Sequence, residues 1–246
     1  MLSKLINELN GLAFKSTRKW SKSEKLFFFH RYSKIFSQIP SIKRGQLGLE
    51  IGLCGGIIAF YLKRRFELDK LYTLEHPLIA KQFSKKYLSA LKNENIILKS
   101  CDLHTEKLPW KDNFFDFVVF SEVMEHLIPP KLPFVFNEIK RVLKPNGWLL
   151  VTTPNISSFI KRVNLLRGKN PTEFNLNLHK NATFGHIREY SMDEVESIVN
   201  KENFKTVKKW YFMIDENRNL ALQIESIVSK FVPSLANNIA ILAKKR

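Results

Sequence analysis

Two carboxylates and an imidazole lie within one short stretch, Ser121-Glu-Val-Met-Glu-His126. Glu125 and His126 follow Glu122 by three and four residues, so one helical turn would direct all three to one side. These groups bind divalent cations, and an imidazole also acts as a general base near neutral pH. The stretch predicts a metal site or an acid–base centre. The alternative is that Glu122 contacts a ligand or the backbone, Glu125 is solvated and His126 makes only local hydrogen bonds.

A second group of residues has the pattern of a nucleotide-binding turn. The sequence from Glu50 to Gly56 follows an apolar run and leads directly into a helical pattern, so its glycines lie at a strand-to-helix turn. Glycine at such a turn permits a positive φ and a close approach of a ligand to the backbone. Gly52 and Gly56 are the positions expected to need this freedom, and Cys54 lies between them.

Acidic residues follow at the ends of the next two expected strands. Glu75 lies 25 positions after Glu50, where a carboxylate can accept hydrogen bonds from both hydroxyls of a ribose. Asp102 and Leu103 close the following strand, where a side-chain acceptor and a backbone N–H can bind the edge of an adenine. Together with the glycine turn, these positions predict a nucleoside-type ligand at one edge of a sheet.

From Gln46 onward, short apolar runs alternate with amphipathic stretches, which is typical of βαβ units and a mostly parallel sheet. We expect strands at Gln46–Ile51, Leu71–Glu75, Ile96–Ser100, Phe115–Phe120 and Trp148–Thr153, and helices at Ile57–Arg65, Pro77–Leu91 and Pro133–Leu143. Five strands joined by four crossovers make a doubly wound α/β sheet.

The region after Pro154 predicts a loop, a helix and two more strands. The polar stretch Arg167–Gly185 is too long for an ordinary connection and is a candidate substrate loop. Ser191 and Glu194 form a capping box that opens a helix through Val199. The last expected elements are strands at Phe204–Ile214 and Asn238–Lys244, separated by a helix at Leu220–Phe231.

Residues 1–45 form an N-terminal helical extension rich in basic and aromatic side chains, and residues 46–246 form the main domain. Apolar positions from Leu26 to Ile39 recur at three and four, which predicts a helix that Pro40 ends. This helix is either a substrate-side lid or membrane-surface helix, or a helix packed on the edge of the domain with a solvated basic face.

Of the 246 residues 44% are hydrophobic, enough for a full core, and the formal net charge is +17. That charge attracts anions such as nucleic acid, acidic lipids or phosphorylated substrates, although a generally lysine-rich protein has it too. Neither a signal peptide nor a transmembrane segment is expected. Cys54 and Cys101 are too few and too far apart for a disulfide framework, so the expected location is cytoplasmic.

Over Gln46 to Lys245 the sequence resembles the class I S-adenosylmethionine-dependent methyltransferases. The resemblance rests on the glycine turn, Glu75 and the following pieces, in this order: Cys101-Asp-Leu103, Leu108-Pro109, Phe114-Phe-Asp116, Leu143-Lys-Pro-Asn-Gly147 and His186-Ile-Arg-Glu-Tyr190. It implies a Rossmann-like, mostly parallel seven-stranded sheet whose antiparallel last strand, Asn238–Lys244, lies beside the fifth. It also implies S-adenosyl-L-methionine as cofactor, bound by Glu50, Gly52, Cys54, Gly56, Glu75, Asp102, Leu103 and Ser121. Cys54 departs from the family pattern, which has glycine at that position.

The stretch from Glu122 to His126, with Thr153-Pro-Asn155 and the later His186, further resembles two groups of metal-assisted O-methyltransferases. These are the small-RNA 2′-O-methyltransferases and the ubiquinone-pathway O-methyltransferases. The resemblance implies that Glu122, Glu125, His126 and His186 hold Mg²⁺, Mn²⁺ or Zn²⁺ beside the acceptor oxygen. The residues expected in catalysis are Glu125, His126 and His186, and without a metal either histidine would be the general base.

The leading hypothesis is therefore O-methylation of a small-molecule, lipid-linked or glycan acceptor that the basic N-terminal segment attracts if it is anionic. RNA 2′-O-methylation is the second hypothesis, and peripheral membrane contact is compatible with the charge. A third is a binding protein that keeps the fold without catalysis, which Cys54 alone supports. A dinucleotide oxidoreductase would share the glycine turn and Glu75, but not the antiparallel last pair of strands.

Overall fold

The structure, a computed structural model, describes residues 32–33, 35–53, 55–172, 185–214 and 219–246. Cys54, most of the N-terminal segment 1–45 and most of the candidate loop Arg167–Gly185 lie outside these ranges. Two compact units are distinguished, Met1–Val119 with Val142–Lys144, and Phe120–Arg141 with Pro145–Arg246.

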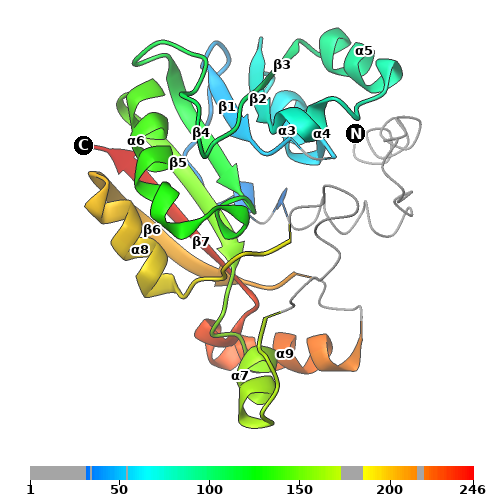
Figure 1. Ribbon diagram of the computed structural model, residues 1–246, viewed down its shortest axis with the longest axis vertical. Helices are drawn as coiled ribbons and strands as arrows, with labels where there is room; N and C mark the ends of the chain where they lie inside the picture. Colours follow the sequence, from blue (N-terminus) through cyan, green and yellow to red (C-terminus); the bar gives the residue numbers. More distant parts are fainter. Residues whose placement is uncertain (1–31, 34, 54, 173–184, 215–218) are drawn as a thin grey trace. The chain divides into compact units, whose positions relative to one another are not determined.

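Seven strands form one sheet in the order β3-β2-β1-β4-β5-β7-β6 (Figure 1). The strands are β1 (Gly48–Ile51), β2 (Leu71–Glu75), β3 (Ile96–Ser100), β4 (Phe115–Ser121), β5 (Leu143–Pro154), β6 (Phe204–Phe212) and β7 (Asn238–Lys245). The helices are α3 (Ile57–Arg65), α4 (Pro77–Ala80), α5 (Lys85–Asn93), α6 (Leu132–Val142), α7 (Phe159–Leu166), α8 (Met192–Lys201) and α9 (Leu220–Phe231). Three short 3₁₀ helices are η1 (Met124–His126), η2 (Pro129–Lys131) and η3 (Pro233–Leu235).

The expected doubly wound α/β sheet with an antiparallel end is confirmed. β1 pairs with β2, and β2 with β3, in parallel, whereas β7 runs antiparallel to both β5 and β6. β7 is thus inserted between the fifth and sixth strands, as the resemblance implied.

In the first unit the core lies around β1 and β2, where Leu49, Ile51 and Leu71 are almost fully buried. Asp116 on β4 accepts a hydrogen bond from the backbone N–H of Leu47 at 2.8 Å and forms an ion pair with Lys144. The short apolar runs therefore became strands because both of their faces are covered, as is usual in parallel sheets.

Part of the expected N-terminal helix is described. Residues 32–33 and 35–36 are helical, and Tyr32, Ile35 and Phe36 are buried. The ring of Phe36 stacks on Tyr61 of α3 at 5.4 Å between centroids. For these residues the structure agrees with a helix packed on the domain edge.

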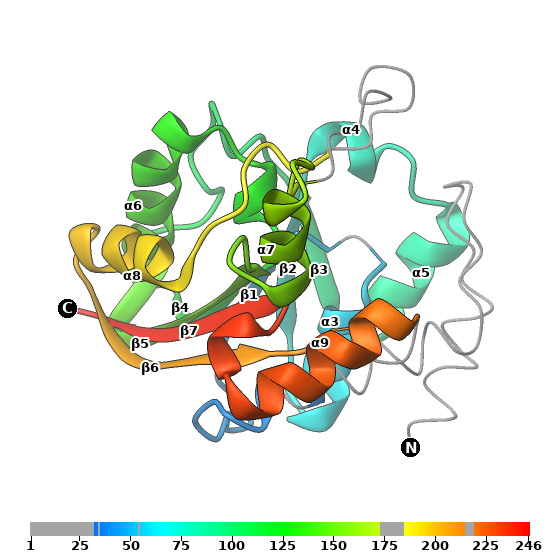
Figure 2. The ribbon, with the colours of Figure 1, turned by 90° about the horizontal axis from the view of Figure 1, so that it is seen from below.

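In the second unit, α6 and α8 lie beside the β5–β7 strands, and α7 and α9 lie next to each other (Figures 1 and 2). Phe136 of α6 packs edge-on against Phe120 and Phe204, with centroids 5.8 and 6.4 Å apart. The expected capping box is confirmed, because the Ser191 hydroxyl accepts from Glu194 N–H and the Glu194 carboxylate accepts from Ser191 N–H.

Three sequence expectations were wrong in detail. The single helix expected over Pro77–Leu91 is two helices, because Ser84 has an extended backbone and its hydroxyl caps α5 by accepting from Tyr87 N–H. β5 begins at Leu143 and not at Trp148 as expected, so Leu143–Gly147 is part of that strand, with Asn146 at φ 60°. Helix α7 was not expected.

We predict that Gly48→Ala lowers the free energy of unfolding by about 1–3 kcal/mol, as overpacking of a core does. A Cβ at Gly48 would lie 2.1 Å from Cζ of Phe117, and both residues are held in the core. Chemical denaturation measures the loss. Phe117→Leu should relieve the overlap, so the double variant should be more stable than the sum of the two single effects, and strict additivity would contradict this explanation.

Candidate functional site

The glycine turn after β1 has the backbone that the sequence predicted. Gly52 and Gly56 have φ of 91° and 72°, in the left-handed region. The N–H groups of Gly52 and Leu53 both donate to the carbonyl of Leu74 on β2, at 2.9 and 3.2 Å. A Cβ on Gly56 would lie 2.4 Å from the Tyr87 hydroxyl. The turn is therefore closed against β2 and requires glycine at position 56.

The ends of the first three strands meet, as expected for a parallel sheet. The hydrogen bond from Gly52 N–H ties the end of β1 to β2, and Cys101 N–H donates to the carbonyl of Glu75, which ties the end of β3 to β2. Nε2 of His76 lies 4.0 Å from Oδ1 of Asp102. The structure thus brings Gly52, Glu75 and Asp102 to one edge of the first unit.

Glu50 is the most unusual acid at this edge. Its side chain is 1% exposed, and neither carboxylate oxygen has a hydrogen-bond partner in the described part of the chain. Burial, and then the charge of Glu75, raise the pKa of Glu50 well above its ordinary value. Glu75, also buried, accepts a hydrogen bond from His76 N–H at 2.8 Å. Two buried carboxylates side by side fit a ligand that carries positive charge.

Asp102 is occupied by its own turn. Its carboxylate accepts from His104 N–H at 2.9 Å and from the Thr105 hydroxyl at 3.1 Å. Burial acts to raise the pKa of Asp102, but these hydrogen bonds and the nearby imidazoles outweigh it and lower the pKa. The half-buried Leu103 lies in the same turn. Asp102 is thus held by its own turn after β3.

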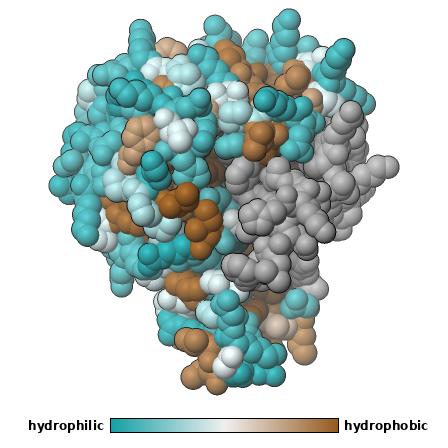
Figure 3. Space-filling view, viewed as in Figure 1, coloured by the Kyte–Doolittle hydropathy of each residue, from teal (hydrophilic) through white to brown (hydrophobic). Residues whose placement is uncertain are grey.

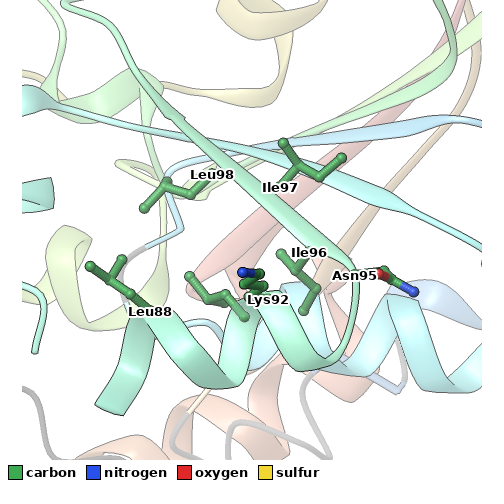
Figure 4. A pocket seen from close by; sticks show the side chains of 7 residues that line it. Leu88, Lys92, Asn95, Ile96, Ile97 and Leu98 are labelled. Atoms are coloured by element: carbon green, nitrogen blue, oxygen red, sulfur yellow. The ribbon is translucent and has the colours of Figure 1, made fainter. Parts of the chain in front are cut away.

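The aromatic residues next to this turn belong to a core cluster. Trp110, Phe114 and Phe115 surround Tyr72 edge-on, with centroid distances of 5.3 to 6.1 Å. A separate hollow of about 310 Å³ lies between α5 and β3 and is lined by residues such as Leu88 and Ile97 (Figure 4). That hollow extends to Asn95 and Ile96 at the start of β3. The site residues follow the other ends of the strands, so the hollow is not the ligand site.

In the second unit, Ser121 and Glu122 belong to a hydrogen-bond network at the ends of the strands. The Ser121 hydroxyl lies 2.6 Å from that of Thr152, which donates to Oε1 of Glu122 at 2.8 Å. The side-chain amide of Asn238 donates to both oxygens of Glu122 at 3.1 Å. Glu122 has φ of 55°, so the chain turns sharply away from β4 here. The Glu122 carboxylate thus contacts β5 and β7 residues.

Glu125, His126 and His186 come together. One ligand atom from each of the three lies within 4.8 Å of the other two. The imidazole rings of His126 and His186 meet edge-on with centroids 5.0 Å apart, and His126 Nε2 is 3.9 Å from Glu125 Oε1. Glu125 is 1% exposed, whereas about a quarter to a third of each histidine side chain is accessible. A buried carboxylate at the base of two accessible imidazoles is the geometry of a small cation site or an acid–base centre.

Each member of this cluster is held by a further contact. The Thr153 hydroxyl donates to Oε2 of Glu125 at 3.0 Å, and the backbone carbonyl of Glu125 accepts from Ile187 N–H at 2.7 Å. His126 Nδ1 lies 3.1 Å from the carbonyl of Gly185. A carbonyl can only accept, so Nδ1 carries the proton and the lone pair of the neutral ring is on Nε2.

His186 is oriented by an ionised carboxylate. Its Nδ1 lies 3.0 Å from Oε1 of Glu189, and Lys161 of α7 forms an ion pair with Oε2 of the same residue. Burial acts to raise the pKa of Glu189, but the hydrogen bond to His186 and the Lys161 charge outweigh it and hold the pKa below its ordinary value. Glu189 therefore accepts the Nδ1 proton, which leaves the Nε2 lone pair for a ligand.

Sequence reasoning missed Lys161 and the orienting roles of Thr153 and Glu189. The spacing of His186 and Glu189 was the one available signal, since it places an acceptor three residues from a histidine. His76 caps α4 by accepting from Leu78 N–H.

Residues 49–151 match the family described as "Methyltransferase domain". An uncharacterized protein of Methanocaldococcus jannaschii is 38% identical over 90 residues, which are 34% of this chain and 37% of that protein. A SAM-dependent methyltransferase of Archaeoglobus fulgidus has a similar structure, with a TM-score of 0.60 and 17% identity over 90% of this chain and 97% of its own. One of Methanosarcina mazei gives a TM-score of 0.60 and 15% identity over 87% and 97% of the two chains.

The strand order is that of the class I methyltransferase fold, as the solved structures show. Residues 49–151, from β1 to β5, match a methyltransferase domain. Both findings favour an S-adenosylmethionine-dependent methyltransferase over the dinucleotide oxidoreductase. Among the helices of the described ranges, none combines the length and hydropathy that a membrane span needs.

We predict that Glu50→Gln raises Tm of the ligand-free protein more at pH 8 than at pH 4.5. The folded state binds the Glu50 proton more tightly than the unfolded chain, so stability is lost as the pH rises from about 4.3, the ordinary carboxyl pKa, through the raised folded pKa. The variant lacks this loss of stability, so at pH 8 its Tm should be about 2–8 °C above that of the wild type. Differential scanning calorimetry at both pH values tests this, with the exposed Glu67→Gln as control. A gain that is equal at the two pH values would contradict it.

Proposed function

We propose that this enzyme methylates a hydroxyl oxygen of a small-molecule, lipid-linked or glycan acceptor at the cluster of Glu125, His126 and His186. The observation that carries the proposal is that each of the three groups is oriented by a partner of its own: Thr153, Gly185 and Glu189. A nitrogen acceptor loses its proton after the transfer, when the attached methyl group has already made that proton acidic. A hydroxyl acceptor, by contrast, needs a base or a cation that assists the loss of its proton before the transfer. A preorganised base or cation site therefore favours an oxygen acceptor.

The cofactor side is the edge of the first unit. S-adenosylmethionine supplies a methyl group on a sulfonium that is already a good leaving group. In this proposal Gly52 and Gly56 allow a close approach to the backbone, the Glu75 carboxylate accepts from the ribose, and Asp102 and Leu103 contact the base. The buried Glu50 has no hydrogen-bond partner in the described part of the chain, which favours a cationic ligand. The sequence also predicted Ser121, which belongs to the second unit, and Cys54, which lies outside the described residues.

The donor set of the cluster fits a divalent cation. One buried carboxylate and two imidazoles that present Nε2 are suitable ligands for Mn²⁺ or Zn²⁺, and less so for Mg²⁺, which prefers oxygen. A bound cation would lower the pKa of the acceptor hydroxyl. Glu122 was expected to be a fourth ligand, but its carboxylate accepts hydrogen bonds from Thr152 and Asn238, so we leave it out of the proposed set.

The protein's own groups account for the rest of the proposed chemistry. Glu189 holds His186 and the Gly185 carbonyl holds His126, each with a protonated Nδ1, so both rings present a basic Nε2. Either nitrogen can take the hydroxyl proton. The buried carboxylate of Glu125 beside His126 favours the imidazolium that forms, as a negative charge within about 4 Å does.

Apolar side chains flank the cluster and bear on the acceptor. Ile128 and Ile187 are 47% and 52% exposed, and they lie two positions and one position from His126 and His186. Exposed isoleucines beside a polar centre favour an acceptor that carries an apolar part next to its hydroxyl. This supports a small-molecule or lipid-linked acceptor over a plain glycan.

RNA 2′-O-methylation is the second candidate, supported by the net charge of +17 and the same cluster. It predicts retention on single-stranded RNA that weakens steeply between 50 and 200 mM salt.

We predict that Glu75→Ala weakens S-adenosylhomocysteine binding by about ten- to a hundredfold, the value of one or two hydrogen bonds to a carboxylate. Isothermal titration calorimetry measures the affinity. Glu67→Ala is the matched control and should leave it unchanged. Equal affinity of the Glu75 variant and the wild type would contradict the ribose assignment.

For the cluster, Glu125→Gln and His186→Gln should each lower the affinity for Mn²⁺ at least about a hundredfold, and Glu189→Gln by about 10–100-fold through the orientation of His186. Titration of the metal-stripped protein with Mn²⁺ measures this, and S-adenosylhomocysteine affinity should stay near that of the wild type. Glu122→Gln is the control, because it replaces a carboxylate that binds Thr152 and Asn238.

If Glu122→Gln weakens Mn²⁺ binding as much as Glu125→Gln, the four-ligand set implied by the sequence is correct and ours is wrong. If the wild type does not bind Mn²⁺ or Zn²⁺ at all, the histidines alone remain as bases.

A further inference from the structure

In helix α9 of the second unit a buried side carries polar residues, and the exposed side is largely apolar. Glu225, Ser226 and Ser229 are 1%, 9% and 9% exposed. On the other side of the helix, Ile227 and Phe231 are 55% and 82% exposed. A surface helix normally has the opposite arrangement, because its apolar stripe faces the core. The inverted pattern indicates that the outward side of α9 is itself a contact surface.

The polar side is inward because Glu225 caps helix α7. Its Oε1 accepts from the N–H of Ile160 at 2.9 Å, in the first turn of α7, where N–H groups have no partner within the helix. Burial raises the pKa of Glu225, and contacts with Ile160, Ser158 and Lys161 counteract that rise. This contact fixes how α9 is rotated, so the exposure of its apolar side follows from specific packing.

The exposed apolar residues of the two helices form one named surface, the α7–α9 face. Its members are Leu165 (65% exposed), Leu166 (88%), Leu220 (71%), Ile224 (41%), Ile227 (55%), Phe231 (82%) and Val232 (46%). α7 and α9 contact each other, and Figure 3 shows hydrophobic side chains gathered at the lower end, where Figure 1 draws these helices. Single exposed apolar residues are common, but two large ones above 80% on neighbouring helices are not.

The charges on these helices are positive. Arg162, Arg167, Lys169 and Lys230 are exposed on or directly after α7 and α9. The only acidic residue in either helix is Glu225, which is buried. Within the described residues none of the four cations forms an ion pair with a carboxylate. Helices that lie in the interface of an anionic membrane typically combine large apolar side chains with surrounding lysines and arginines that form no ion pairs.

We infer that the α7–α9 face binds an anionic lipid surface, with its leucines, isoleucines and phenylalanine inserted among the acyl chains and its cations at the headgroups. A second copy of the chain would bring the same cations together on a molecule of net charge +17. A protein partner is recognised partly by hydrogen bonds, and the exposed residues of α9 that could form them are few, with Gln223 and Lys230 as the main ones. An anionic lipid surface brings no like charges together and does not require hydrogen-bond groups on the helix. This face is different from the basic N-terminal segment, and the inference does not depend on which acceptor is methylated.

The test is co-sedimentation of the full chain with vesicles of phosphatidylcholine alone or with 30% phosphatidylglycerol, at 0.1 and 0.5 M NaCl. The wild type should bind the anionic vesicles, and Leu166→Ser with Phe231→Ser should lower the partition coefficient at least about tenfold at both salt concentrations. Val207→Ser, which removes an equally apolar residue 53% exposed on β6, is the matched control and should bind as the wild type does. Arg167→Gln with Lys230→Gln should lower binding only to the anionic vesicles.

Three results would overturn the inference. The double serine variant could bind anionic vesicles as the wild type does, which would assign the binding to general charge. A wild-type dimer in sedimentation velocity that becomes a monomer in Phe231→Ser would assign the face to a second copy. A fall in Tm of the double serine variant far beyond that of Val207→Ser would show that another segment of the chain covers the face. Loss of Mn²⁺ or S-adenosylhomocysteine binding has no bearing on it.

Discussion

The constraint on which the second unit's site depends is the sharp turn of the chain at Glu122. The carboxylate at the end of β4 accepts hydrogen bonds from residues of β5 and β7, and Glu122 N–H donates to the Thr152 carbonyl at 2.8 Å. Because Glu122 has a positive φ, the chain leaves the sheet there and forms η1 two residues later. The same turn brings Glu125 beneath Thr153, the neighbour of Thr152. The backbone turn at Glu122 thus places the cluster, and the Glu122 carboxylate is not one of the proposed ligands.

The buried carboxylates show how local environment separates structural acids from those that need a ligand. Glu189 has a histidine and a lysine within contact distance, and its pKa is lowered. Glu225 accepts from the start of α7, and burial still raises its pKa. Glu50 has a buried carboxylate as its neighbour and no hydrogen-bond partner in the described part of the chain, and its pKa is raised most clearly. Of these buried acids, Glu50 is therefore the one whose ionised form the described surroundings stabilise least.

Sequence patterns located the strands and α3 well because each depends on a local run of apolar residues, as at Leu71–Glu75 and Ile57–Arg65. The pattern also found α9 with its correct ends, but it could not tell which side faced inward, because that depends on Glu225 meeting Ile160 65 positions away. The hydrogen bonds of Glu122 could not be predicted for the same reason, since Asn238 is 116 positions away. Spacing placed Glu125 and His126 together and the family resemblance added His186, whereas the contacts that orient the three residues are long-range and could not be inferred from spacing.

Helix α7 connects the two features that the sequence did not predict. At its first turn it is held by Glu225 of α9, and one residue later Lys161 forms the ion pair with Glu189, which in turn holds His186. The orientation of His186 therefore depends on where α7 lies, and α7 lies where α9 fixes it. A lipid surface that engages the outward sides of α7 and α9 would act on helices only two contacts away from the histidine. An acceptor with an apolar part, which Ile128 and Ile187 favour, would then be methylated where such molecules accumulate.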